Sequence, residues 1–200
     1  MKYILHNFKK LHTNFDDGFS LPPFMSVSLL MIYSIILGAF GYLVGIDLFS
    51  YEIYAFDHIF QSLVIQSLIL LIFINSNIII LYFFIKFFRK RTVSIITIYS
   101  YYALFGTVIF TVAVLLYFTV IGGHYIADIP IGPLRIMFGI SIIIILTLTN
   151  LYPAILLFLT LKKEPIDVFW PIILCVLIIH AMTFLLFRVW DTVDILLLWL

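Results

Sequence analysis

One histidine and three asparagines lie inside long apolar runs of the sequence, where polar side chains are uncommon and need an explanation. His180 lies near the middle of the fifth run, Asn150 in the fourth, and Asn75 and Asn77 in the second. Ionisable groups inside a bilayer cost free energy to insert, so they are functional candidates by default. A neutral imidazole needs one donor and one acceptor, and the amide of Asn77 or Asn150 has both to offer. We therefore treat these four residues as a candidate intramembrane polar site.

Two kinds of function fit such a site. In the first, His180 transfers a proton or binds a ligand near the bilayer midplane, as a small transporter or carrier requires. In the second, the polar groups only join helices, and each interhelical hydrogen bond contributes roughly 1 kcal/mol or less. A carrier should place His180, Asn77 and Asn150 around one water-accessible cavity, whereas a scaffold should bury them in pairwise contacts. We expect pairwise contacts.

A second candidate is the basic segment that joins the second and third apolar runs. Residues 86–91 read Lys-Phe-Phe-Arg-Lys-Arg, with cations at Lys86, Arg89, Lys90 and Arg91. Beside a membrane, each such cation attracts anionic lipid by roughly 1 kcal/mol. The segment is thus a topology determinant, and it is also a candidate cytoplasmic patch for anionic lipid headgroups or for an acidic surface of a partner protein.

Other kinds of chemistry have weaker signals. Asp57, His58, His124 and Asp128 fall in polar loops and suit a divalent metal, but no fixed ligand spacing such as HExxH accompanies them. No serine stands in a Gly-x-Ser-x-Gly motif, no predicted span holds two acids, and the sequence has no Walker motif. We therefore expect no catalytic residue, no metal and no cofactor, and no nucleic-acid partner.

Long apolar segments must position these side chains. The 200 residues are 64% hydrophobic and 10% charged, whereas soluble domains carry about 25% charge. Apolar runs of about 18 residues or more are typical of membrane-spanning helices. The sequence predicts an all-α, polytopic integral membrane bundle that forms a single domain over residues 1–200. Its five transmembrane helices are predicted at about residues 24–46, 59–85, 93–121, 136–161 and 168–187.

Both ends of the chain are expected to lie on the membrane surface. Within residues 1–20, the apolar residues Ile4, Phe8 and Leu11 recur at helical spacing, which predicts an amphipathic interfacial helix. A disordered polar leader is the alternative. Residues 191–200 are too short to cross a bilayer, and we predict that they form a short interfacial C-terminal tail.

Small residues predict where helices approach closely. Gly38 belongs to a stripe of small residues in the first span, and Ala103 and Thr107 belong to another in the third span. Such stripes let neighbouring backbones come close together in a membrane. We therefore expect these two spans to make close helix–helix contacts, and we assign packing rather than ligand binding to the stripes.

Positive charge is distributed unequally between the two sides of the predicted membrane. Five crossings place nine of the 11 Lys and Arg residues on the starting side and leave Arg135 and Arg188 on the other. Because cytoplasmic loops carry the excess of Lys and Arg, the N-terminus is predicted to be cytoplasmic and the C-terminus outside. The Ile- and Phe-rich composition fits a bacterium or an organelle-encoded subunit, and a bacterial cytoplasmic membrane is our working location.

Two local segments add to this layout. Pro22-Pro23-Phe24 opens the first span, and residues 91–105 read Arg-Thr-Val-Ser-Ile-Ile-Thr-Ile-Tyr-Ser-Tyr-Tyr-Ala-Leu-Phe after a basic turn. Together with five spans and a cytoplasmic N-terminus, they resemble the Yip-domain (Ypt-interacting protein) membrane family. Members often have a Gly-rich turn where this chain has Arg89-Lys90-Arg91, and a proline where it has Phe105-Gly106. The resemblance implies a non-enzymatic membrane protein that engages partners or lipids through its cytoplasmic side.

Three functions therefore remain open. The first is a Yip-like scaffold or interaction protein whose partners are membrane proteins, anionic lipid headgroups or both. The second is a small transporter with a midplane site around His180. The third is an accessory membrane subunit of a larger complex, which should purify only together with its partners.

Overall fold

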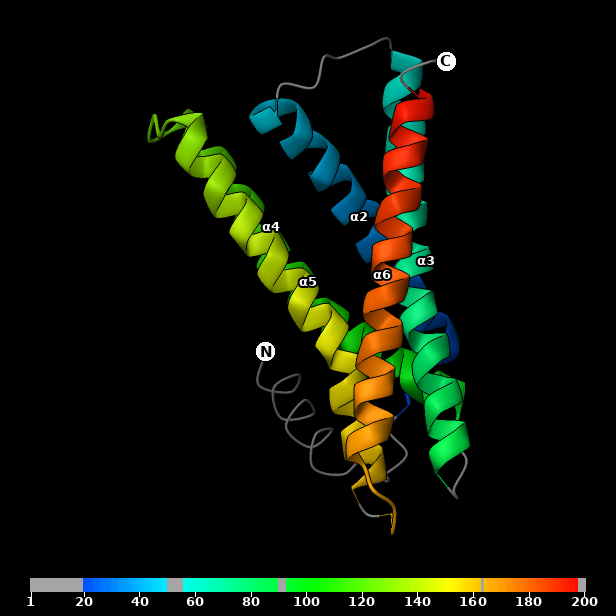
Figure 1. Cartoon of the computed structure of the whole chain (residues 1–200). Helices are drawn as coiled ribbons and strands as arrows, with labels where there is room; N and C mark the ends of the chain where they lie inside the picture. The colour runs from blue at the N-terminus through cyan, green and yellow to red at the C-terminus, as the bar shows by residue number, and fades with distance from the viewer. Residues whose placement is uncertain (1–19, 50–55, 90–92, 163, 198–200) are drawn as a thin grey trace.

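The computed structural model describes residues 20–49, 56–89, 93–162 and 164–197, and five long α-helices make up most of them. They are α2 (Pro23–Phe49), α3 (Phe56–Phe88), α4 (Ile95–Tyr125), α5 (Ile131–Leu161) and α6 (Phe169–Leu197) (Figure 1). The described residues contain no strand, so the predicted all-α fold is confirmed. The predicted interfacial helix at residues 1–20 lies, apart from Ser20, outside the described residues.

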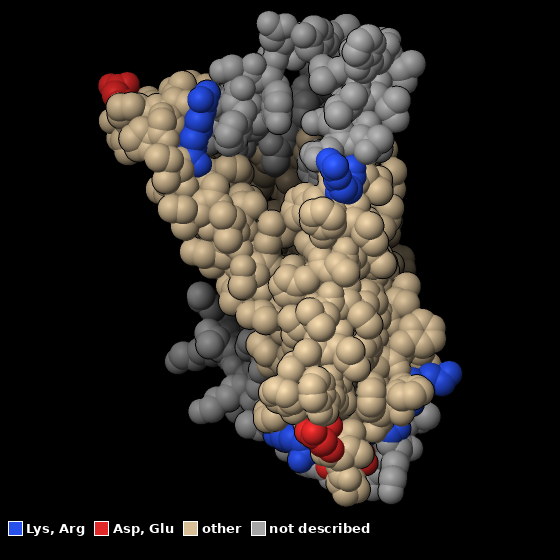
Figure 2. Space-filling view, viewed as in Figure 1, with Lys and Arg blue, Asp and Glu red and all other residues tan. Residues whose placement is uncertain are grey.

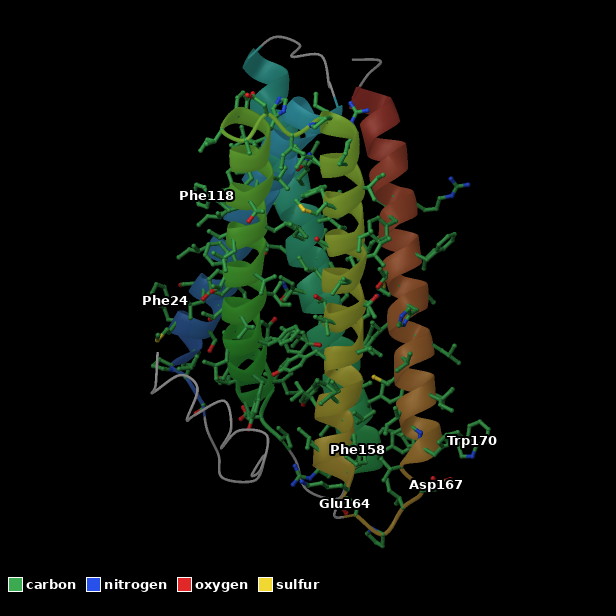
Figure 3. All side chains as sticks on the ribbon, turned by 90° about the vertical axis from the view of Figure 1, so that its left-hand side faces the viewer. Phe24, Phe118, Phe158, Glu164, Asp167 and Trp170 are labelled. Carbon is green, nitrogen blue, oxygen red and sulfur yellow. The ribbon has the colours of Figure 1, made fainter. Side chains whose placement is uncertain are left out.

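Each of the five described helices is long and apolar enough to cross a membrane. Charged side chains gather toward the two ends of the molecule and leave a belt without charged residues between them, as Figure 2 shows. Many large apolar side chains project outward from this belt, among them Phe24 and Phe118, which are 84% and 63% exposed (Figure 3). Outward-facing apolar side chains of this kind suit a surface that lies in lipid rather than in water.

The starts of two helices differ slightly from the predicted limits because polar side chains cap them. α4 begins at Ile95 rather than at residue 93, and the Ser94 side chain accepts a hydrogen bond from the Ile96 N–H at 3.3 Å. α6 begins at Phe169 rather than at residue 168, and Asp167 Oδ1 accepts from the Phe169 N–H at 2.9 Å. These side chains satisfy N–H groups that the first helical turn leaves unpaired.

The α4–α5 connection is shorter than the predicted loop. α4 continues to Tyr125 and α5 already begins at Ile131. Gly122 remains helical, and its carbonyl accepts the Ile126 N–H at 2.9 Å. Asp128 then turns the chain with a φ of 50°, a conformation that Asp adopts more readily than most residues. Gly122 therefore does not end α4, which continues to Tyr125.

The predicted C-terminal tail is not a separate segment in the part that the structure describes. α6 continues to Leu197, well past the predicted limit at residue 187. Residues 188–197 contain no proline or glycine that would interrupt the helix. Residues 191–197 of the predicted tail are therefore a continuation of α6.

The main hydrophobic core lies at one end of the bundle, and all five described helices contribute to it. Leu30, Ile78, Ile98, Leu157 and Ile179 represent the five helices in this cluster. This region surrounds the C-terminus of α3 and the N-terminus of α4, and we call it the packed end. A second, small cluster joins the opposite tips of α4 and α5.

Between these two clusters α4 is held by α2, where Tyr33 stacks on Phe110 and Phe40 stacks on Tyr117, but no side chain of α4 or α5 is fully buried. No residue between Ala103 and Val120 in α4 is buried, and none between Leu134 and Asn150 in α5. Figure 1 shows this pair leaning away from α3 and α6 toward the α4–α5 loop. We call this part the α4–α5 arm. The bundle is therefore densely packed at the packed end, whereas along the arm α2 covers one side of α4 and the side chains of α5 remain partly or fully exposed.

Candidate functional site

The four polar residues predicted to form one intramembrane site occupy different surroundings. His180 lies on an exposed face of α6, and its Nδ1 is 2.8 Å from the Val176 carbonyl oxygen of the same helix. No described hydrogen bond joins its ring to Asn77 or Asn150. The imidazole thus uses a backbone partner within its own helix, and it does not form the centre of a polar cluster.

Asn75 joins two helices. Its Nδ2 donates to the Leu71 carbonyl at 2.7 Å, and its Oδ1 accepts from the Tyr99 hydroxyl at 2.5 Å. Tyr99 belongs to α4, so the amide connects α3 to α4 near the packed end. The site is half-buried, and both functional atoms of the amide have partners. This is a pairwise interhelical contact of the expected kind.

Asn150 makes the corresponding connection between α5 and α6. Its side chain is buried, and its Oδ1 lies 3.1 Å from the Thr183 hydroxyl. Thr183 is also buried, and its hydroxyl is 2.8 Å from the Ile179 carbonyl of its own helix. The pair places one polar contact where α5 leaves the packed end, and it uses both side chains for helix packing.

Asn77 differs from the other two asparagines. Its side chain is fully buried, and neither amide atom forms a hydrogen bond within the described part of the chain. The Tyr102 hydroxyl is buried in the same way. A buried polar group without a partner costs about 1–3 kcal/mol. Asn77 is therefore the one residue of the predicted site whose polar group is not explained by helix packing.

A polar seam between α2 and α4 was not predicted from the sequence. Ser26 Oγ lies 3.3 Å from Ser100 Oγ, and the Tyr33 hydroxyl lies 2.7 Å from Thr107 Oγ1. Both pairs are 74 residues apart in the sequence, which shows that the two helices run parallel and in register. The seven-residue spacing within each helix puts both polar groups on one face, and this spacing is the signal that could have revealed the seam.

Close backbone approach completes the contacts of α2. A Cβ atom on Gly38 would lie 2.6 Å from Ser67 Oγ and 3.1 Å from the Ser67 backbone nitrogen of α3. The absence of a side chain at this glycine therefore permits the contact, as the small-residue stripe predicted. On the α4 side, Ala103 is fully buried and Thr107 meets Tyr33. Both stripes serve helix packing.

A tyrosine cluster occupies the centre of the packed end. Tyr152 of α5 stacks on Phe105 at 3.8 Å between ring centroids and meets Tyr102 edge-on at 5.4 Å. Its hydroxyl donates to the Tyr101 carbonyl at 3.2 Å. Cys175 of α6 is buried in the same core. These aromatic contacts fix α4 against α5.

The basic segment is only partly available as a surface. Arg89 follows α3, and its Nε lies 3.7 Å from Glu164 Oε1, with side chains only 8% and 14% exposed. Lys86 remains exposed, and its ammonium stands 6.0 Å from the centre of the Tyr82 ring. Lys90 and Arg91 lie outside the described residues. Arg89 therefore makes an ion pair inside the packed end, whereas the exposed Lys86 is available to contact a partner.

Of the four loop residues considered for a metal, the structure describes the side chains of His124 and Asp128. Within the described residues, no group of three or more His, Cys, Asp and Glu side chains could hold a metal ion. His124 packs edge-on against Tyr125, with ring centroids 4.7 Å apart. The side chains of Asp57 and His58 are outside the described set. The described geometry thus offers helix–helix contacts and a charged end surface.

Comparisons with known proteins do not add a name to this geometry. The chain matches no protein-family model, no curated protein and no solved structure. The Yip-domain resemblance rests on the local segments and layout of the sequence. The contacts of the packed end and its charged surface are therefore the basis for the function proposed below.

Proposed function

We propose that this chain is a non-enzymatic membrane scaffold or interaction protein of Yip-like type. In this proposal it sits in a bacterial cytoplasmic membrane with the packed end on the cytoplasmic side, where it engages partner proteins or anionic lipid headgroups. The observation that carries the proposal is the use of intramembrane polar groups. Asn75, Asn150 and Thr107 each bond a neighbouring helix, and they do so in three separate pairs with Tyr99, Thr183 and Tyr33.

The packed end has the properties of a fixed platform. The Arg89–Glu164 pair links the end of α3 to the α5–α6 connection, and the tyrosine cluster fills the interior behind it. Exposed cations at Lys86 and Lys162 and the exposed Trp170 surround this core on the same end. Trp suits a membrane interface and Lys suits anionic headgroups or acidic protein surfaces.

Photo-cross-linking from the packed end tests the proposal. The photoreactive amino acid p-benzoylphenylalanine replaces Phe87, which is 83% exposed and next to Lys86. The control replaces Ile126, which is 86% exposed in the α4–α5 loop at the opposite end. In native membranes we expect discrete protein adducts or enrichment of anionic-lipid adducts from position 87, and neither of these from position 126. Equal products from the two positions, or none from position 87, would contradict a cytoplasmic interaction surface.

One observation favours the carrier as a second candidate function. The buried Asn77 amide forms no hydrogen bond within the described chain, and a transported polar ligand or proton path would give it a partner. Thiol labelling separates the two functions. In a Cys175→Ala background, Asn77→Cys should resist a water-soluble thiol reagent if the chain is a scaffold, while Phe87→Cys reacts. Rapid labelling at position 77 would favour the carrier.

A further inference from the structure

A half-open apolar groove lies between α3, α5 and α6. Phe73 of α3, Leu146 of α5, and Thr183 and Phe187 of α6 line it together with three further apolar side chains. The Thr183 hydroxyl lies within bonding distance of Ile179 and Asn150, so the groove surface is apolar. Leu146 and Thr183 stand at the midpoints of their helices. The groove is therefore at about the depth of the bilayer midplane.

One face of α5 runs from the packed end through this groove and on along the arm. Asn150 is buried on that face, and Leu146 lines the groove one turn earlier. Ile142 is 37% exposed, and a Cβ on Gly139 would meet nothing within 4 Å. Arg135 stands eleven residues before Leu146, about three helical turns, so it lies on the same face. The face of α5 that contacts other helices at the packed end therefore continues along the arm, where it is not covered, and it ends at Arg135.

The length of this face matches one leaflet of a bilayer. Eleven residues of α-helix rise about 16 Å, and half of the hydrocarbon core is about 15 Å. With Leu146 at the midplane, Arg135 stands at the edge of the hydrocarbon core, from which its long side chain extends toward the lipid phosphates. A guanidinium group binds phosphate through two parallel hydrogen bonds. An acyl chain of that leaflet would reach from the arginine to the groove.

The groove is shallow, and the arginine at the end of its face indicates which occupant suits it. It has a volume of about 340 Å³, including its open mouth. A single turn of a helix about 10 Å in diameter occupies about 420 Å³. The groove is therefore shallow, with room for part of a slender acyl chain or for single side chains, and the phosphate that Arg135 would bind selects the lipid as the occupant.

We infer that this face binds one anionic phospholipid of the leaflet at the α4–α5 loop end. Its phosphate contacts Arg135, and one acyl chain lies along Ile142 and enters the groove at Leu146. The arm is open where this chain would lie, since no residue of α5 between Leu134 and Asn150 is buried. The inference concerns the end opposite the platform and does not depend on the proposed function.

Lipid photo-cross-linking in nanodiscs tests the site. The purified full chain is placed in phosphatidylcholine nanodiscs that contain a phosphatidylglycerol probe with a diazirine near the end of one acyl chain. We expect cross-links at the groove residues Phe73 and Leu146. Arg135→Gln should lower their yield about fivefold, and Arg135→Lys should keep most of it. Leu146→Trp, which fills the groove, should also remove them.

Two controls make the result specific. Arg188→Gln removes the other described cation of this end, on α6, and should leave the yield unchanged. Thermal unfolding of each variant identifies a folding defect, and if Leu146→Trp unfolds, the comparison of Arg135→Gln with Arg135→Lys decides. Equal losses in Arg135→Gln and Arg188→Gln would overturn the site, because they indicate general attraction of anionic lipid. Uniform labelling of the groove and of outward residues such as Leu115 would also overturn the lipid site, as would a protein–protein adduct at the groove.

Discussion

At the scale of single residues, orientation on the helix decides the role of a polar group. Asn75 and Asn77 are two positions apart, which places their side chains about 200° apart around α3. Asn75 therefore reaches Tyr99 of α4, whereas Asn77 is buried without a hydrogen bond in the described chain. His180 likewise bonds the backbone of its own helix. A polar residue type inside a span does not identify a functional site.

The two neighbouring asparagines give a matched pair of variants. Asn77→Leu replaces an unpartnered buried amide with an apolar group of similar size, so we expect unchanged or higher stability, by up to about 1 kcal/mol. Asn75→Leu leaves the Tyr99 hydroxyl without its acceptor and should lower stability by about 1–3 kcal/mol. Unfolding of both variants in mild detergent measures the difference. Equal destabilisation would show that Asn77 has a polar partner of its own.

At the scale of the helices, α2 holds the bundle together through two different contacts. It approaches α3 closely at Gly38, and it runs parallel to α4 along the seam that includes Ser26–Ser100 and Tyr33–Thr107. In a membrane, packing and interhelical hydrogen bonds rather than water exclusion drive helix association. The position of α2 therefore depends on small and hydroxyl-bearing residues.

Adding a methyl group at the close contact should separate the two helices. Gly38→Ala puts a Cβ 2.6 Å from Ser67 Oγ and 3.1 Å from the Ser67 backbone nitrogen. We expect a loss of about 1–3 kcal/mol, because the backbone contact cannot relax as easily as the hydroxyl. Gly139→Ala is the control, since its Cβ would meet nothing within 4 Å. Unfolding in detergent measures the stability of both variants. Equal stability of Gly38→Ala and Gly139→Ala would contradict the close contact between α2 and α3.

The helices were predictable from the sequence, but their partners were not. Long apolar runs located the five described helices, while Ser94 and the helical Gly122 shifted individual limits. The small residue Gly38 marked a close approach correctly. The choice of Tyr99 and Thr183 as partners of Asn75 and Asn150 depends on how each helix is rotated and packed. Sequence periodicity within one helix does not contain that information.

At the scale of the whole molecule, the two ends differ in packing. The packed end combines a core drawn from all five described helices with the Arg89–Glu164 pair, whereas the α4–α5 arm has few buried residues. The proposed interaction with partners at one end and the proposed lipid site at the other both use this difference. The closed end would keep its shape while the arm adapts to what it contacts.

Breaking the ion pair should weaken the packed end. Glu164→Gln leaves the largely buried Arg89 side chain without its described carboxylate partner. We expect a loss of about 1–2 kcal/mol, less than for a fully buried pair because both groups retain some exposure. Asp128→Asn, in the opposite loop, is the control, because Asn also tolerates the φ of 50° found there. Equal stability of the two variants would show that the pair does not hold this end.

The five-span arrangement is tested most directly by thiol labelling of intact cells. In a Cys175→Ala background, cysteine replaces either Phe87 at the packed end or Ile126 in the α4–α5 loop, both of which are highly exposed. A membrane-impermeant maleimide should label position 126 in intact cells and position 87 only after the membrane is opened. Labelling of both positions from the same side, or of position 87 alone in intact cells, would contradict the arrangement.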